Sequence, residues 1–114
     1  MKYHIEISSI AESEADSAFL RLSQLISPTK ASQWYSGLLK AIESLSKMPR
    51  RCALAREDYY FSQEIRQLLY GRGHNFYRIL FVIVEEKIPT VRILHIRHVS
   101  QQTIGEESET SDTN

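Results

Sequence analysis

The feature that most constrains this fold is the apolar run FYRILFVIV at residues 76–84. From residue 79 onward it is apolar on both faces, which is typical of a central strand that is covered on two sides. The sequence therefore predicts helices on one side of this strand, and another element or a partner protein on the other. The run and its neighbours also carry most of the arginines and histidines, so we expect any functional site to lie in this part of the chain.

Three further segments have the patterns of strands. Residues 2–8 alternate apolar and polar side chains, with Tyr3, Ile5 and Ile7 on one face. Residues 65–70 and 91–98 are also rich in apolar strand-forming side chains. A turn with two glycines at residues 71–75 predicts a hairpin with the run at 76–84, and residues 85–89 predict the next turn.

Residues 11–26 and 31–45 show the apolar spacing of two amphipathic helices. Ser8 or Ser9 is expected to cap the first helix, and Ser27-Pro28 to end it and start the second. The link between them is very short, so the two helices are expected to form a hairpin.

The elements together predict an α+β fold with the order β-α-α-β-β-β. Short links favour a small antiparallel sheet of three or four strands, with the N-terminal helical hairpin packed on one face. Residues 49–63 have no clear period and are expected to form a connecting loop. We predict one domain over residues 1–104, followed by an acidic tail at 105–114 that is expected to be disordered.

Composition and the absence of certain motifs indicate a cellular location and exclude several kinds of site. The sequence has neither an apolar run of membrane-spanning length nor a signal peptide, and its single Cys52 suits a reducing compartment, so a cytoplasmic location is expected. It has no phosphate loop, metal-ligand spacing or Ser-His-Asp arrangement, so neither a metal nor a cofactor is expected. Net charge is zero overall, but without residues 105–114 it is +4, which makes the body mildly basic.

The order and spacing of several motifs resemble the RelE/ParE superfamily of type II toxins, especially ParE-like plasmid-stabilisation proteins, over about residues 2–102. The motifs are Ser27-Pro28-x-x-Ala31-x-x-Trp34, Ala41-Ile-x-Ser-Leu45-x-x-x-Pro49-x-x-Cys-x-Leu-Ala-x-Glu57, Ile65-Arg66-Gln67-Leu68, Tyr77-Arg78-Ile79-Leu80-Phe81 and Ile93-Leu-His-Ile-Arg97-His98. The resemblance implies a small growth-inhibiting toxin that a cognate antitoxin neutralises in a hetero-oligomer. It also implies two modes of action: ParE-like members block DNA gyrase, and RelE-like members cleave mRNA on the ribosome.

Cleavage of RNA would need acid-base groups and cations around the phosphate. The only candidates for such a site are His74 and His98 for proton transfer, with Arg66, Arg78 and Arg97 as phosphate clamps. Arg78 lies within an apolar strand, so its guanidinium is expected either in a salt bridge or in a site. Arg97 and His98 are expected to point to opposite faces of their strand.

The chain has no lysine between Lys47 and Lys87, and arginine is a poor base. We therefore favour a toxin that binds a replication target such as gyrase. A ribosome-dependent mRNA endonuclease is the alternative, and a third is an inactive homologue that only binds its antitoxin.

Overall fold

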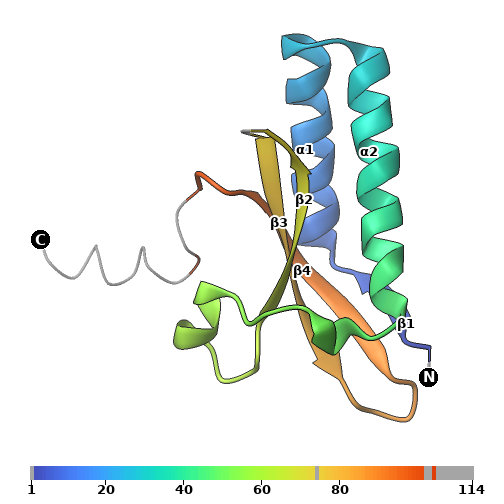
Figure 1. Ribbon diagram of the computed structural model, residues 1–114, viewed down its shortest axis with the longest axis vertical. Helices are drawn as coiled ribbons and strands as arrows, with labels where there is room; N and C mark the ends of the chain where they lie inside the picture. The colour runs from blue at the N-terminus through green and yellow to red at the C-terminus, as the bar shows by residue number, and fades with distance from the viewer. Residues whose placement is uncertain (1, 74, 102–103, 105–114) are drawn as a thin grey trace, which may run out of the picture.

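The computed structural model describes residues 2–73, 75–101 and 104. Its helices and strands follow the predicted order, which confirms the α+β prediction (Figure 1). They are β1 (His4–Ile7), α1 (Ser9–Leu25), α2 (Pro28–Glu43), β2 (Arg66–Arg72), β3 (Asn75–Val84) and β4 (Thr90–His98). The predicted tail at 105–114 and the candidate residue His74 lie outside the described residues.

The strands form one four-stranded sheet in the order β1-β4-β3-β2. As predicted, β2, β3 and β4 are antiparallel. The prediction of a wholly antiparallel sheet is wrong for β1, which pairs in parallel with β4, so the sheet is mixed. Short turns fix the direction only of strands that follow each other in the chain. The first and last strands are joined by no such turn, so their relative direction was left unconstrained.

Serine caps set the start of both helices. The Ser8 hydroxyl accepts a hydrogen bond from the Ala11 amide at 3.1 Å and donates one to the Leu94 carbonyl at 3.1 Å, so it also fixes α1 to β4. The Ser27 hydroxyl accepts from the Lys30 amide at 3.1 Å, and Pro28 is the first residue of α2. The predicted cap at Ser8 or Ser9 is thus at Ser8, and the predicted helical hairpin is confirmed.

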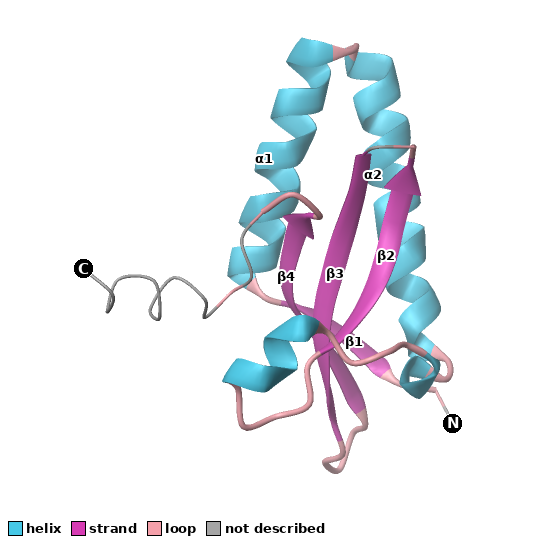
Figure 2. Ribbon diagram, turned by 60° about the vertical axis from the view of Figure 1, so that its left-hand side comes forward, coloured by secondary structure: helices cyan, strands magenta, loops and turns pink. Residues whose placement is uncertain are grey.

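The main core lies between the helical hairpin and one face of the sheet. Figure 2 shows both helices on one side of the sheet, with the connecting segment and its short helix on the other. Small side chains on α1 allow it to approach the sheet closely, and larger ones on α2 and the strands fill the space. The buried members include Ala11, Ala15, Ala18, Leu38, Ile42, Ile79, Phe81, Val91 and Ile93.

The second face of the sheet is covered in part by the chain itself. Ala55 and Ile65 pack with Leu80 and Val82 in a smaller cluster. The connecting segment is held there because the Ala55 amide donates to the Ile65 carbonyl at 2.7 Å.

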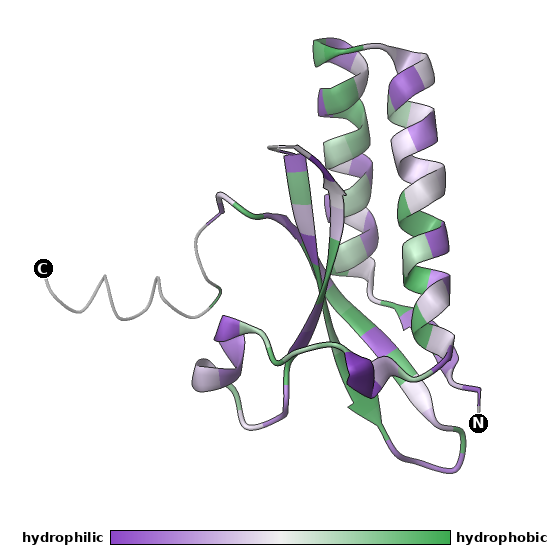
Figure 3. Cartoon of the chain, in the orientation of Figure 1, coloured by the Kyte–Doolittle hydropathy of each residue, from purple (hydrophilic) through white to green (hydrophobic). Residues whose placement is uncertain are grey.

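The predicted loop at 49–63 also contains two short 3-10 helices, Pro49–Arg51 and Arg56–Tyr60. Figure 3 shows the Pro49–Arg51 turn as strongly hydrophilic and the end of β3, marked by its arrowhead, as hydrophobic. No helix in the described part of the chain is long and apolar enough to cross a membrane.

Candidate functional site

The described candidates for an RNA-cleaving site are divided between the two faces of the sheet. Arg66 pairs with Phe81 and His98 with Tyr77, and both partners belong to the core under the helices. Arg66 and His98 therefore lie on the helical face, but Phe81 and Tyr77 are separated by roughly 13 Å along β3. Arg78 and Arg97 face each other across β3 and β4 on the opposite side of the sheet.

Arg66 and His98 each make polar or ring contacts with nearby residues of the chain. Arg66 Nη1 donates to the Cys52 carbonyl at 2.7 Å, and Nη2 lies 3.3 Å from the Glu64 carboxylate, so Arg66 ties the connecting segment to β2. His98 Nδ1 lies 2.7 Å from the Ser100 hydroxyl, and its ring stands edge-on to Tyr77 with centroids 5.2 Å apart. On the helical face, Arg66 is thus tied to the connecting segment, and His98 to Ser100 and Tyr77.

Arg78 forms a buried ion pair with Glu57, which is the salt-bridged alternative of the two that its sequence position allowed. Arg78 Nη1 lies 2.7 Å from Glu57 Oε1, and Nη2 lies 2.5 Å from Oε2. The side chains are 4% and 1% exposed. Glu57 Oε2 also accepts the Ile104 amide at 3.2 Å.

Burial alone would raise the pKa of Glu57. The hydrogen bonds and the charge of Arg78, together with backbone amides, outweigh burial and lower this pKa below its ordinary value. Glu57 therefore neutralises Arg78 with a charged carboxylate at neutral pH. The pairing of Glu57 with Arg78 was not predicted from the sequence; the available signal was an arginine inside an apolar strand, which needs a buried acid somewhere in the chain.

A second pair that the sequence did not reveal closes the edge of β4 beyond the end of β1. The Glu14 carboxylate accepts the Ile96 amide at 2.9 Å and lies 3.2 Å from His95 Nδ1. An acid near the start of a helix is explained by the helix dipole alone, and nothing in the sequence around Glu14 indicates contact with a strand about 80 residues away.

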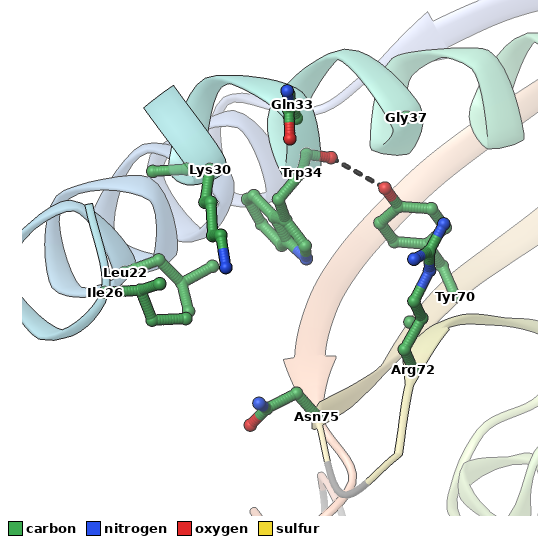
Figure 4. A pocket seen from close by; sticks show the side chains of 11 residues that line it. Leu22, Ile26, Lys30, Gln33, Trp34, Gly37, Tyr70, Arg72 and Asn75 are labelled. Carbon is green, nitrogen blue, oxygen red and sulfur yellow. Dashed lines mark hydrogen bonds between the residues drawn. The ribbon is translucent and has the colours of Figure 1, made fainter. Parts of the chain in front are cut away.

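A cavity of about 570 Å³ opens between the helical hairpin and the tip of the β2–β3 hairpin (Figure 4). We call it the hairpin cavity. Leu22 and Ile26 from α1, Trp34 from α2 and Tyr70 from β2 supply its walls. The other lining residues are Lys30, Ala31, Gln33, Gly37, Gly71, Arg72 and Asn75.

Aromatic packing holds the floor of the hairpin cavity in place. The Trp34 ring lies 6.2 Å from the Tyr70 ring and 5.1 Å from the Tyr77 ring, measured between centroids. The Tyr70 hydroxyl donates to the Trp34 carbonyl at 2.8 Å, and burial raises the pKa of this phenol. Gly37 permits that contact, because a Cβ there would lie 2.2 Å from the Tyr70 oxygen.

The lining of the hairpin cavity holds two cations and no carboxylate, and it lacks the pairing of a nucleophile with a base that covalent chemistry needs. In residues 2–73, 75–101 and 104, no three histidine, cysteine or acidic side chains gather in a way that could hold a metal ion. Trp34 belongs to one of the family motifs, but the hairpin cavity was not predictable from the sequence, because it requires the relative placement of two hairpins.

The sequence matches no family model and has no significant match among curated proteins. A solved structure described as the chromosomal ParDE TA system from P. aeruginosa contains a similar chain, with a TM-score of 0.69 and 19% sequence identity. The match covers 87% of this chain and 98% of that chain. The protein therefore has the RelE/ParE-like fold, in which a strand, two helices and three further strands form a mixed four-stranded sheet.

Proposed function

We propose that this protein is the toxin of a type II toxin-antitoxin system, a cytoplasmic growth inhibitor that a cognate antitoxin neutralises in a hetero-oligomer. The observation that carries the proposal is the fold likeness to the ParDE TA system structure, which extends over 87% of this chain. A likeness of that extent covers both the helical hairpin and the sheet, so it concerns the whole architecture rather than one motif.

The toxin acts by binding a replication target such as DNA gyrase. Two features of the sheet support binding over RNA cleavage. Glu57 occupies both terminal nitrogens of Arg78, so this cation is not available to a phosphate. Arg66 and His98 lie at opposite ends of the helical face, so they cannot act together on one bond.

Brief induced expression of the chain alone in bacteria tests the proposal. Growth should stop, and plasmid supercoiling or gyrase-linked DNA breaks should change while mRNA on ribosomes stays intact. In vitro, the purified chain should inhibit supercoiling by gyrase. Co-expression with the small protein encoded beside it should restore growth, and the two should co-purify.

Other results would replace the proposal with one of its alternatives. Cleaved mRNA with normal supercoiling would indicate the endonuclease. Arg97 and His98 lie on opposite faces of the sheet, so either Arg97→Ala or His98→Ala, but not both, should then abolish cleavage in a folded chain. Unimpaired growth together with a stable antitoxin complex would indicate an inactive homologue. Unimpaired growth with no complex would overturn the toxin assignment altogether.

A further inference from the structure

The hairpin cavity combines an apolar wall with uncompensated positive charge. Leu22, Ile26 and Trp34 form the wall, and Lys30 and Arg72 are exposed at its rim. Figure 4 shows the Lys30 ammonium and the Arg72 guanidinium on either side of the Trp34 ring. The lining includes no aspartate or glutamate, so no neighbour in the cavity neutralises these two charges.

Lys30 and Arg72 differ from several other cations of this chain. Four arginines are paired with glutamates: Arg50 with Glu85, Arg66 with Glu64, Arg78 with Glu57 and Arg92 with Glu6. Within the described residues, the side chains of Lys30 and Arg72 make neither a hydrogen bond nor an ion pair. Their charges are thus available to an anion that enters the hairpin cavity.

Trp34 adds an unsatisfied hydrogen-bond donor to the same place. Its Nε1 is buried and has no hydrogen-bond partner among the described residues. Figure 4 shows the indole nitrogen on the part of the ring that points away from α2 and toward the cavity. A buried donor without an acceptor is unfavourable, so a ligand whose oxygen reaches Nε1 after a small shift of the rim side chains gains a hydrogen bond there.

The apolar surface continues beyond the cavity at the end of α1. Leu25 is 73% exposed and Ile26 is 53% exposed. A small molecule inside the cavity would leave this surface in water, whereas a peptide segment can fill the cavity and cover the helix end at once. The occupant that fits both features is therefore a segment of another protein.

We propose that the hairpin cavity binds a segment of the antitoxin in which an acidic side chain is flanked by bulky apolar residues. The carboxylate lies between Lys30 and Arg72 and accepts from Trp34, and the apolar neighbours pack on Leu22 and Ile26. The identity of the partner rests on the proposed function; the chemistry of the segment rests on the cavity.

The first test uses the complex of the full chain with the protein encoded beside it. Lys30→Glu and Arg72→Glu should each raise the Kd about tenfold, since each replaces an attraction by a repulsion. Lys40→Glu is the matched control, because Lys40 is an exposed lysine of the same helix outside the cavity lining, and its Kd should stay unchanged. Equal Kd values for the wild type and both cavity variants would overturn the inference while leaving the toxin assignment intact.

The second test needs no antitoxin. Anilinonaphthalene sulfonate, an aromatic anion, is compared with neutral phenylnaphthylamine as a probe of the full chain. Binding is followed through the emission of Trp34, the only tryptophan in the sequence. The anion should bind at least tenfold more tightly, and Arg72→Glu should remove that preference while Lys40→Glu retains it.

The two tests separate the possible failures. Equal binding of the anion and the neutral probe would overturn the chemistry assigned to the hairpin cavity. Failure of the wild-type chain to bind the neighbouring protein would overturn the proposed function, and with it the assigned partner.

Discussion

Glu57 determines what Arg78 can do. A buried arginine in an otherwise apolar strand is stable only if an opposite charge meets it, and Glu57 does so with both oxygens. The same carboxylate accepts the Ile104 amide, so it also holds the end of the described chain against the connecting segment. The pair links β3, the 3-10 helix Arg56–Tyr60 and Ile104.

Removal of one partner of this pair should be costly. We expect Glu57→Leu to lower the free energy of unfolding by about 3–5 kcal/mol, because it leaves Arg78 charged and buried. The double variant Glu57→Leu with Arg78→Met should recover most of that loss, because neither charge is then buried alone. Urea unfolding gives the values. Glu64→Gln, which removes the exposed acid of the Arg66 pair, is the control and should change stability by less than about 1 kcal/mol.

An equal loss in the Glu57 single and double variants would contradict this account of the ion pair. It would indicate that the variants lose stability through altered packing around Leu80 and not through an unpaired buried charge.

The lowered pKa of Glu57 predicts a pH dependence with a definite sign. The unfolded chain binds the proton more tightly than the folded one, so the ionised pair contributes its full stability above the unfolded pKa of about 4.3. That contribution is lost as pH falls through the lower folded pKa. The stability of the wild type relative to the double variant should therefore be constant above about pH 6 and fall below about pH 4. A difference that grows on acidification would contradict the assignment.

At the scale of elements, the contact between α2 and β2 depends on the absence of a side chain at Gly37. Gly37→Ala should gain about 1 kcal/mol of helix propensity but force the new Cβ against the Tyr70 oxygen, 2.2 Å away, so we expect a net loss of about 1–3 kcal/mol. In a Tyr70→Leu background the same change should become stabilising. Ser36→Ala, at an exposed neighbour, is the control for propensity. Thermal unfolding of the four variants checks the sign change, and an unchanged penalty in the Tyr70→Leu background would contradict the contact.

The boundaries of the elements were largely predictable, because they depend on local chemistry. Ser8 and Ser27 satisfy amides three residues away, and Pro28 cannot continue the preceding helix. The alternation around Ile5 and the double-sided apolar run at β3 likewise need no distant information. The parallel direction of β1, the partner of Arg78 and the hairpin cavity all depend on residues far apart in the chain, and no local pattern encodes them.

At the scale of the whole molecule, aromatic side chains from the helical layer and from the sheet contact one another at the centre. Trp34 of α2 contacts Tyr70 of β2 and Tyr77 of β3, so its environment depends on both layers at once. We therefore expect residues 2–104 to unfold as one cooperative unit. Trp34 fluorescence and far-ultraviolet circular dichroism should give the same urea midpoint. Two separated midpoints would contradict this expectation and indicate that the helical hairpin unfolds independently.

The pairing of β1 with β4 bears on when the sheet can form during synthesis of the chain. β4 lies between β1 and β3, yet it is the last strand to be made, so a nascent chain that ends before Thr90 has no place for β1 in the sheet. The hydrogen bond from the Ser8 hydroxyl to the Leu94 carbonyl likewise cannot form until Leu94 has been made. The complete four-stranded sheet can therefore form only when nearly all of the chain up to β4 has been made.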